Sequence, residues 1–275
     1  MLTWNGAEPA VLPPLTRAER LRGALRLAGV VIVTLAAVVV FLIGRLLRRR
    51  LSRHVKFHFR AARTWARIML RLMGVRRAIV GTPIDGPGVW LANHSGWADI
   101  LALRSARLVN FVSKAEVRGW PAVGWIAEMC DTVFIERRRA AAGEQRNVLA
   151  ERLRAGQLLC LFPEGTSSDG LRVLPFKSTL LSALYDGGPV PGARVQPVTV
   201  NWIAPAGRDP AFYGWWGDMS FEGHVWDILC RSCGGRVEII FHEVAEVGRF
   251  ADRKALTRWA EGAVRSAKRV AAEVP

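Results

Sequence analysis

From Arg77 onward, short apolar runs alternate with longer stretches of helical pattern. The apolar runs have the length of buried strands, and we expect strands at 78–80, 89–91, 110–113, 133–135, 158–162, 195–200 and 237–241. Helices are expected between them, at 97–106, 116–129, 140–155 and 178–185, and a last amphipathic helix is expected at 251–271. Strands that alternate with helices at this spacing predict an α/β domain with a mostly parallel sheet flanked by helices.

A charge-free apolar segment at residues 27–44 precedes this domain, after a mixed leader with no strong periodicity. Its eighteen residues are just long enough for a transmembrane helix, and they also suit a helix that lies in one leaflet. A buried core helix is the third alternative. A cleaved signal peptide is disfavoured because a basic segment, not a small-residue one, follows. We therefore expect a helical membrane anchor at the N-terminus.

Residues 45–77 carry twelve Lys or Arg and no Asp or Glu, which predicts that this flank stays on the cytoplasmic side. Within it, basic and apolar side chains fall on opposite sides of a helix. The basic side carries Arg60, Arg63, Arg67 and Arg71, and the apolar side carries Trp65, Ile68, Met69 and Leu72. We interpret this as an interfacial amphipathic helix with its arginines at lipid phosphates; the alternative is a surface helix that packs on the domain. The predicted division is residues 1–76 for the anchor and basic helix, and 77–275 for the α/β domain.

The net charge of +16 implies an anionic partner, which is either nucleic acid or an anionic membrane. Eleven Trp against two Tyr and a hydrophobic content of 51% favour the membrane, because indole rings sit at headgroup depth. No nucleic-acid-reading motif interleaves the basic residues, so no nucleic-acid partner is expected. Between 203 and 235 the aromatic residues Trp215, Trp216, Phe221 and Trp226 either line an acyl tunnel, anchor to the bilayer or pack under a long loop.

The four cysteines do not have the pattern of a secreted disulfide framework. Cys230 and Cys233 form a lone Cys-x-x-Cys, and a zinc site would need two further ligands, whereas Cys130 and Cys160 lie in or beside separate apolar strands. Buried thiols and an incidental pair are the favoured interpretation. We expect neither a metal nor a cofactor.

His94 and Asp99 lie at a predicted strand-to-helix turn, with four residues between them. An imidazole takes a proton from a hydroxyl near neutral pH, and a nearby carboxylate orients it and stabilises its charged form. This is a general-base pair; the plain alternative is a helix-capping Asn93 and an ordinary turn histidine. No Gly-x-Ser-x-Gly elbow is present, so a covalent acyl-enzyme is not indicated. Ser95 is a weaker candidate nucleophile, because neighbours in sequence at a turn rarely align for it.

Three further motifs follow in order: Phe134-Ile135-x-Arg137, Phe162-Pro163-Glu164-Gly165-Thr166, and the apolar strand 195–200 with Pro197. Together with His94-x4-Asp99, they resemble the four motifs of the glycerolipid acyltransferase family, which includes the 1-acylglycerol-3-phosphate acyltransferases. The resemblance covers roughly 79–241. In detail it is closest to the branch that acylates lyso-ornithine lipid, through residues 114–117, 119–121 and 164–170.

The resemblance implies that a membrane-bound enzyme transfers an acyl group directly from a thioester of acyl carrier protein or coenzyme A to a lysolipid hydroxyl. It makes His94 the base and Asp99 its orienting carboxylate, and it assigns acceptor binding to Arg137, Glu164, Gly165 and Thr166. Gly165 also lets the backbone approach a ligand closely. The alternative for these residues is a plain strand end with a helix cap. The expected location is the cell inner membrane, with the catalytic domain on the cytoplasmic side.

One departure from the family bears on the acceptor. Phosphate-binding relatives commonly carry Arg after Glu-Gly-Thr, where this chain has Ser167. An arginine fork suits a phosphate dianion, so its loss favours a zwitterionic amino-acid headgroup with Glu164 as ammonium partner. Lys177 is the alternative source of a compensating cation. Lyso-ornithine lipid is thus the expected acceptor, ahead of 1-acylglycerol 3-phosphate, and a non-catalytic lipid-binding membrane protein is the third hypothesis.

Overall fold

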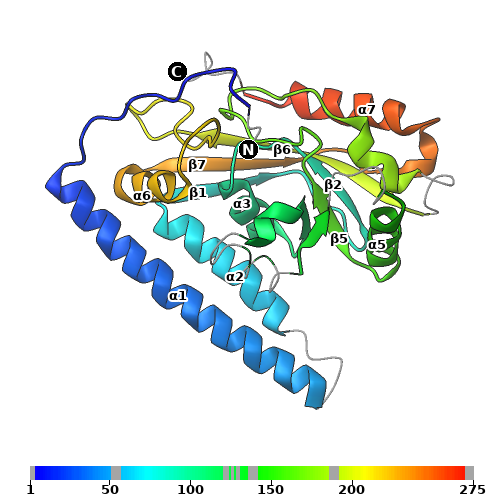
Figure 1. Ribbon diagram of the computed structural model, residues 1–275, viewed down its shortest axis with the longest axis horizontal. Helices are drawn as coiled ribbons and strands as arrows, with labels where there is room; N and C mark the ends of the chain where they lie inside the picture. The colour runs from blue at the N-terminus through cyan, green and yellow to red at the C-terminus, as the bar shows by residue number, and fades with distance from the viewer. Residues whose placement is uncertain are drawn as a thin grey trace.

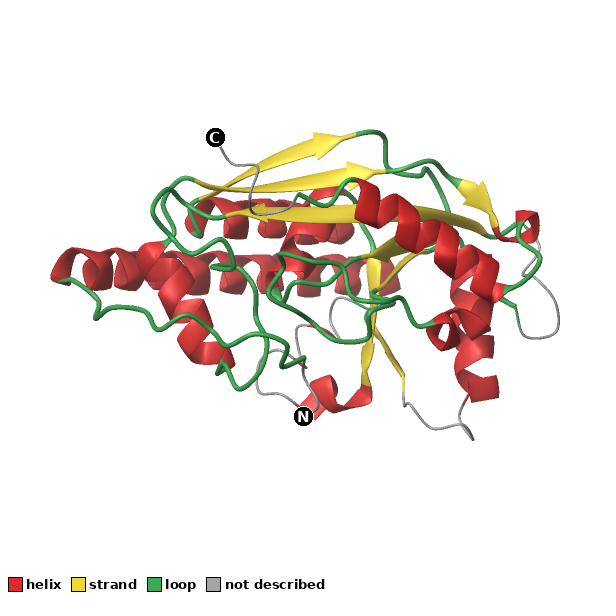
Figure 2. Ribbon diagram, turned by 90° about the horizontal axis from the view of Figure 1, so that it is seen from above, coloured by secondary structure: helices red, strands yellow, loops and turns green. Residues whose placement is uncertain are grey.

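The computed structural model describes residues 4–50, 57–119, 124, 127, 131–135, 142–185 and 192–269, which form one mixed sheet with helices on both faces (Figures 1 and 2). The strands are β1 (Val75–Val80), β2 (Gly88–Ala92), β3 (Asn110–Lys114), β4 (Val133–Ile135), β5 (Leu158–Leu161), β6 (Arg194–Ile203), β7 (Gly235–Phe241) and β8 (Ala245–Glu246). The α-helices are α1 (Arg17–Arg50), α2 (Phe57–Leu72), α3 (Ala98–Ala106), α5 (Ala142–Arg154), α6 (Phe221–Arg231) and α7 (Arg253–Ser266). Short 3₁₀ helices are η1 (Ala115–Gly119), η3 (Ser178–Leu184) and η4 (Val247–Arg249).

The strand order is β1-β7-β6-β2-β5-β3-β4, with β8 paired to β6. Five of the seven pairings are parallel, and β6 is antiparallel to β7 and to β8. The predicted α/β class with a mostly parallel sheet is confirmed, with the antiparallel pairings as an addition. Because β2, β5 and β6 are parallel neighbours, their carboxyl ends meet at one edge of the sheet.

Two hydrophobic cores, one on each face, explain why β2 and β5 in the middle of the sheet have no polar residue. On β2, Trp90 and Ala92 enter the core under α2, α3 and α6, whereas Val89 and Leu91 enter the core under α5, η3 and α7. Successive strand residues point to opposite faces, so a strand covered on both sides has no polar alternation. The Trp90 indole N–H donates to Gln196 Oε1 on β6 at 3.1 Å, which satisfies its one polar group inside the core.

Several predicted elements differ in extent or type. β1 begins earlier than predicted, α7 is shorter than the predicted helix, and the predicted helix at 178–185 is the 3₁₀ helix η3. At the predicted helix 116–129 the structure shows η1, and most of the rest lies outside the described residues. Both α6 and β8 lie in or beside segments in which no element was predicted.

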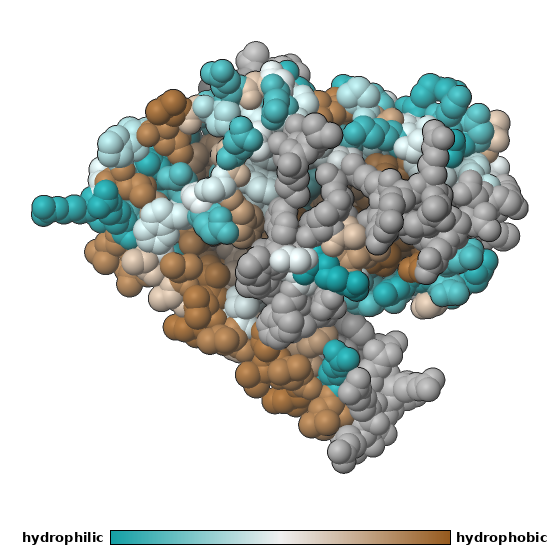
Figure 3. Space-filling view, viewed as in Figure 1, coloured by the Kyte–Doolittle hydropathy of each residue, from teal (hydrophilic) through white to brown (hydrophobic). Residues whose placement is uncertain are grey.

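Helix α1 contains the predicted apolar segment and is long and apolar enough, by length and composition, to cross a membrane. Only 6% of its most apolar window is buried, which disfavours the core-helix alternative, and Figure 3 shows its apolar surface extending away from the domain. Two arginines bind the first half of α1 to the end of α6. Arg22 donates to Cys230 O at 2.9 Å, and Arg26 donates to Leu229 O at 3.0 Å, at the carbonyl end of α6, where a helix favours cations.

The structure corrects the predicted arrangement of the basic amphipathic helix. It is present as α2, but its apolar side packs on the domain and on α1: Met69 and Leu70 are buried in the core, and the Trp65 indole donates to Thr34 Oγ1 at 3.0 Å. Arg63 and Arg67 donate to the Ser105 carbonyl at the end of α3, at 3.3 and 3.1 Å. The alternative of a surface helix packed on the domain therefore describes α2.

Candidate active site

The turn after β2 is built by the Asn93 side chain. Its amide donates to Val200 O at 3.0 Å and its carbonyl accepts Val200 N–H at 2.7 Å, so a side chain continues the pairing of β2 with β6. The backbone is then free to turn towards α3. Asn93 therefore extends the hydrogen bonding between β2 and β6, and it does not cap α3 as the plain alternative held. It places His94 at the edge where three strands end.

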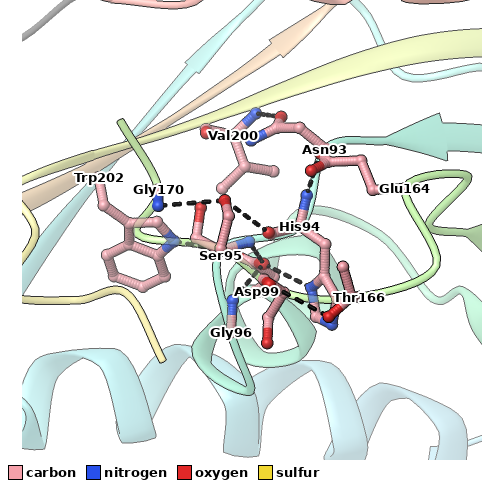
Figure 4. Close-up of polar contacts among 12 residues, drawn as sticks. Asn93, His94, Ser95, Gly96, Asp99, Glu164, Thr166, Gly170, Val200 and Trp202 are labelled. Carbon is pink, nitrogen blue, oxygen red and sulfur yellow. Dashed lines mark hydrogen bonds and ion pairs between the residues drawn. The ribbon is translucent and has the colours of Figure 1, made fainter. Parts of the chain in front are cut away.

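His94 and Asp99 form the predicted pair, with 2.8 Å between His94 Nδ1 and Asp99 Oδ2 (Figure 4). Asp99 is fully buried, and the same Oδ2 accepts the backbone N–H groups of Ser95 and Gly96, at 2.6 and 3.0 Å. Its Oδ1 accepts the Trp202 indole N–H at 2.7 Å. Because the ionised carboxylate only accepts, the His94 proton faces Asp99 on Nδ1, and Nε2 is left as the basic nitrogen.

Two contacts fix the position of His94: its ring stacks on an aromatic side chain, and its backbone carbonyl accepts a hydrogen bond. It stacks on Phe162 with 4.0 Å between ring centroids and 17° between planes, and Phe111 stacks behind Phe162. The His94 carbonyl accepts Ser168 N–H at 3.1 Å. The side chain is 21% exposed, so the ring is fixed and still accessible to a substrate.

Glu164 is buried beside the His94 backbone. Its Oε1 accepts the His94 backbone N–H at 2.9 Å, and its Oε2 accepts the Leu174 N–H at 3.1 Å. Burial raises the pKa of Glu164 to about 8, an effect opposed by these two N–H groups and by Lys268. Glu164 thus joins the turn that carries the base to the loop after β5, and its role in binding the acceptor stays a prediction.

Lys268, which the sequence did not single out, reaches the same place from the end of α7. Its ammonium is buried and donates to Val200 O at 3.1 Å, while Asn201 Nδ2 donates to Ala267 O at 2.9 Å and fastens the segment to β6. Burial lowers the pKa of Lys268 to about 8, and the carboxylates of Asp99, Glu164 and Asp169 act in the opposite direction. Nothing in the sequence near residue 268 pairs it with a motif, so only the fold reveals it.

The remaining predicted site residues are placed as follows. Gly165 has a left-handed backbone, with φ of 70°, in the turn after β5, and Thr166 Oγ1 accepts the Trp4 N–H at 3.3 Å. Lys177 is exposed, and its backbone N–H donates to Pro163 O at 2.8 Å. Arg137 lies outside the described residues. The structure thus gathers His94, Asp99, Glu164, Gly165 and Thr166 at the ends of β2 and β5.

The arrangement does not support a serine nucleophile. Ser95 Oγ is buried and has no hydrogen-bond partner among the described residues, so no base contacts it. The backbone N–H groups of His94, Ser95 and Gly96 all donate to carboxyl groups, so these three N–H groups are already used. The geometry is that of a histidine base that acts on a hydroxyl brought by a substrate.

The aromatic residues of the Gly-rich segment pack around this turn. Trp215 N–H donates to Ser95 O at 2.8 Å, and the Trp216 indole donates to Ala7 O at 2.8 Å. Phe221 contacts Trp97 edge-on with 5.7 Å between centroids. Trp216 is buried and Trp215 and Phe221 are partly buried, so these aromatics pack within the protein beside the turn.

The described cysteines, Cys160, Cys230 and Cys233, are free thiols. In the described part of the chain, no group of three or more His, Cys, Asp or Glu side chains is placed to hold a metal ion. Cys130 lies outside the described residues.

Comparison with known proteins agrees with this geometry. The family model "Acyltransferase" matches residues 75–201, which hold β1 to β6 and the His94–Asp99 pair. The lyso-ornithine lipid O-acyltransferase of Rhodobacter capsulatus is 42% identical over 264 residues, which cover 96% of each chain. A 1-acyl-sn-glycerol-3-phosphate acyltransferase of Neisseria gonorrhoeae is 31% identical, over 64% of this chain and 67% of the relative.

The fold also has a solved counterpart. The 1-acyl-sn-glycerophosphate acyltransferase of Thermotoga maritima superposes with a TM-score of 0.65 at 23% identity, covering 90% of this chain and 92% of the other. The likeness extends beyond the family match at 75–201, since it takes in most of the described chain.

Proposed function

The chain belongs to the acyltransferase family, and on that premise we propose that it transfers a fatty acyl group from an acyl thioester to the hydroxyl of lyso-ornithine lipid. That it is an O-acyltransferase acting on a lysolipid in lipid biosynthesis follows from its relatives. The observation that carries the proposed chemistry is the 2.8 Å contact between His94 and Asp99, because it leaves Nε2 as an accessible base. A non-catalytic lipid-binding protein has no need of this fixed tautomer.

In the proposed reaction His94 Nε2 takes the proton of the lysolipid hydroxyl as its oxygen attacks the thioester carbonyl carbon. The imidazolium that forms is stabilised by the buried Asp99 carboxylate. When the tetrahedral intermediate collapses, the carbon–sulfur bond breaks, and His94 returns the proton to the departing thiolate. An ester and a free thiol are formed, and His94 is regenerated as a neutral base.

The acceptor is proposed from two observations. Four relatives named as lyso-ornithine lipid O-acyltransferases are 33–42% identical over 71–96% of the chain. Independently, Ser167 follows Glu-Gly-Thr where phosphate-binding members of the family commonly carry Arg, and Ser167 is buried, so the chain lacks an arginine fork at this position. A headgroup with one carboxylate and one ammonium has less need of it.

Donor and location are proposed with the same reaction. The donor is an acyl thioester of acyl carrier protein or coenzyme A. The long, exposed apolar α1 and the +16 charge support attachment to an anionic membrane, and the basic flank that follows α1 favours the inner membrane with the catalytic domain on the cytoplasmic side. Association with a membrane itself agrees with the lipid substrates of the relatives.

The test is an acyl-transfer assay on full-length protein purified in detergent. Lyso-ornithine lipid and 1-acylglycerol 3-phosphate are offered separately, each with acyl carrier protein and coenzyme A thioesters, and kcat/KM is compared. We expect lyso-ornithine lipid to be the better acceptor, and the His94→Ala protein to be inactive on both. A wild-type preference for 1-acylglycerol 3-phosphate would overturn the proposed acceptor and leave the enzyme class intact.

A further inference from the structure

We propose that the Arg172 guanidinium binds the carboxylate of the acceptor headgroup, and that Asp169 and Trp4 hold the guanidinium in position for this contact. The inference rests on the proposed acceptor and deepens it, because it names the residue that recognises the amino-acid headgroup. It replaces Lys177, the cation that the sequence suggested.

Arg172 is fixed by a buried carboxylate. Its Nη2 lies 2.8 Å from Asp169 Oδ2 and its Nε lies 3.0 Å from the same oxygen. Asp169 is 2% exposed and also accepts the Leu171 N–H at 3.1 Å, so the partner cannot swing away. The contact occupies one edge of the guanidinium, and no acceptor in the described part of the chain bonds Nη1, which leaves the edge of Nη1 and Nη2 as a second fork.

The loop that carries Asp169 and Arg172 is hydrogen-bonded to the turn that carries His94. Ser168 donates to the His94 carbonyl from its backbone at 3.1 Å and from its hydroxyl at 3.4 Å, and Gly170 N–H donates to Ser168 Oγ at 3.3 Å. A Cβ on Gly170 would lie 3.0 Å from Ser95 Oγ, so the loop lies directly against the turn at this point. These contacts fix the position of Arg172 relative to the base.

The N-terminal leader closes the other side of the loop. Trp4 N–H donates to Thr166 Oγ1, and the Trp4 indole lies 5.1 Å from the Arg172 guanidinium carbon, in a cation–π contact. The leader is itself held down, because the Trp216 indole donates to Ala7 O and Arg231 donates to Pro13 O at 2.6 Å. Trp4 thus connects Thr166 to Arg172.

A carboxylate is the ligand that fits this guanidinium. The Arg172 side chain is 51% exposed although it is bonded to Asp169 and stacked on Trp4, so it is both ordered and open to solvent. Asp169 already balances part of its charge, which suits a monoanion better than a phosphate dianion. A planar fork pairs with a planar carboxylate through two parallel hydrogen bonds. Lys177, in contrast, is an exposed cation whose side chain bonds no residue in the described part of the chain.

The experiment compares two acceptors that differ only in this group: lyso-ornithine lipid and its carboxyl methyl ester. We expect the wild-type protein to prefer the free acid by about 10- to 100-fold in kcat/KM, the size of one charge-assisted bidentate contact. Arg172→Gln should use the two acceptors about equally, and Arg172→Lys should keep a reduced preference. The preference is a ratio within each variant, so a partial loss of folded protein does not change it.

Two further variants sharpen the test. Trp4→Ala should lower the preference for the acid without removing it, since the guanidinium loses its stacking partner and keeps Asp169. Arg249→Gln, an exposed arginine that pairs with the exposed Glu243, is the matched control and should behave as wild type. The inference is overturned if Arg172→Gln retains the full preference, or if the wild-type protein acylates acid and ester equally. Failure of the wild-type protein to use lyso-ornithine lipid at all would instead reject the proposed acceptor.

Discussion

Trp202 and Asp99 meet inside the protein, where the indole N–H donates to Asp99 Oδ1 at 2.7 Å while the other carboxylate oxygen faces His94. Both residues are buried, and they come from β6 and α3. A carboxylate without water needs N–H donors to stay ionised. Trp202 is therefore part of the support of the base, although its position on an apolar strand marks it only as a core residue.

We expect Trp202→Phe to lower the free energy of unfolding by about 1.5–3 kcal/mol, because a buried charged acceptor loses a donor. Turnover should fall as well, by about tenfold, since Asp99 is less firmly held. Trp90→Phe is the matched control: its indole donates to neutral Gln196, so it should cost stability and leave kcat unchanged. Chemical denaturation and steady-state kinetics measure the two quantities. Equal effects of both variants on kcat would contradict a specific role for Trp202.

Removal of the base should abolish acyl transfer. His94→Ala takes away a partly exposed ring, so the fold and membrane binding should persist while turnover is lost. Asp99→Asn should lower turnover by roughly two orders of magnitude or more, as is typical when general-base catalysis is impaired. Turnover, circular dichroism and vesicle binding check these outcomes. A His94→Ala protein with near-normal turnover would refute the mechanism.

The Lys268 ammonium should stabilise the buried carboxyl groups beside His94. Lys268→Met leaves the buried Asp99 and Glu164 carboxylates without this cation, and we expect turnover to fall by about tenfold or more. Because the pKa of Lys268 is about 8, wild-type kcat should decline as the pH rises through that value. Lys268→Arg keeps its charge, so it should retain activity and lose this alkaline decline.

Lys254 provides the control for that experiment, since it is an exposed lysine on α7. Lys254→Met should reproduce the wild-type pH profile. If Lys268→Arg shows the same alkaline decline as wild type, the decline belongs to another group and the expected role of Lys268 is wrong.

Stability in mild acid should depend on His224. Its Nδ1 accepts the Trp97 indole N–H at 3.0 Å, and burial lowers its pKa to about 4. Between pH 6.5 and 4 the unfolded chain binds a proton at this side chain and the folded chain does not. The free energy of unfolding therefore falls as the pH is lowered through this range, by at most about 3 kcal/mol from this group.

A His224→Gln variant isolates this contribution, because its amide oxygen accepts the same indole N–H and does not titrate. The difference in unfolding free energy between wild type and variant should shrink or reverse below pH 6.5 as the wild type loses stability. Urea denaturation at several pH values measures it. A difference that stays constant from pH 7 to 4 would show that His224 does not govern the acid response.

The sequence predicts the strands well because buried parallel strands are continuous apolar runs of definite length. It predicts the base for a similar reason, since His94 and Asp99 are close along the chain and follow the strand 89–91. Glu164 illustrates the limit: its spacing marks it as important, but only the fold shows that both of its oxygens are occupied by backbone N–H groups.

Contacts between distant segments account for most of the remainder. Lys268 and Trp202 lie outside the four motifs and yet reach Asp99 or its neighbours, and Trp4 contacts Thr166 across 162 positions in the chain. The prediction that α2 lies at the membrane interface, with its arginines at lipid phosphates, is wrong for a different reason. Amphipathic periodicity identifies the helix, but it does not distinguish a bilayer from a protein surface as the partner of the apolar side.

Helix α1 is attached to the domain at two points, through Arg22 and Arg26 to the end of α6 and through Thr34 to Trp65 of α2. These contacts hold it against α6 and α2, and Figure 1 shows it running out from the domain in one direction. In the proposed membrane-bound enzyme, the depth and tilt of this helix therefore set the height of His94 above the lipid surface. We expect the acceptor lipid to reach that height by lateral diffusion in the membrane, and the proposed thioester donor to reach it from the aqueous side.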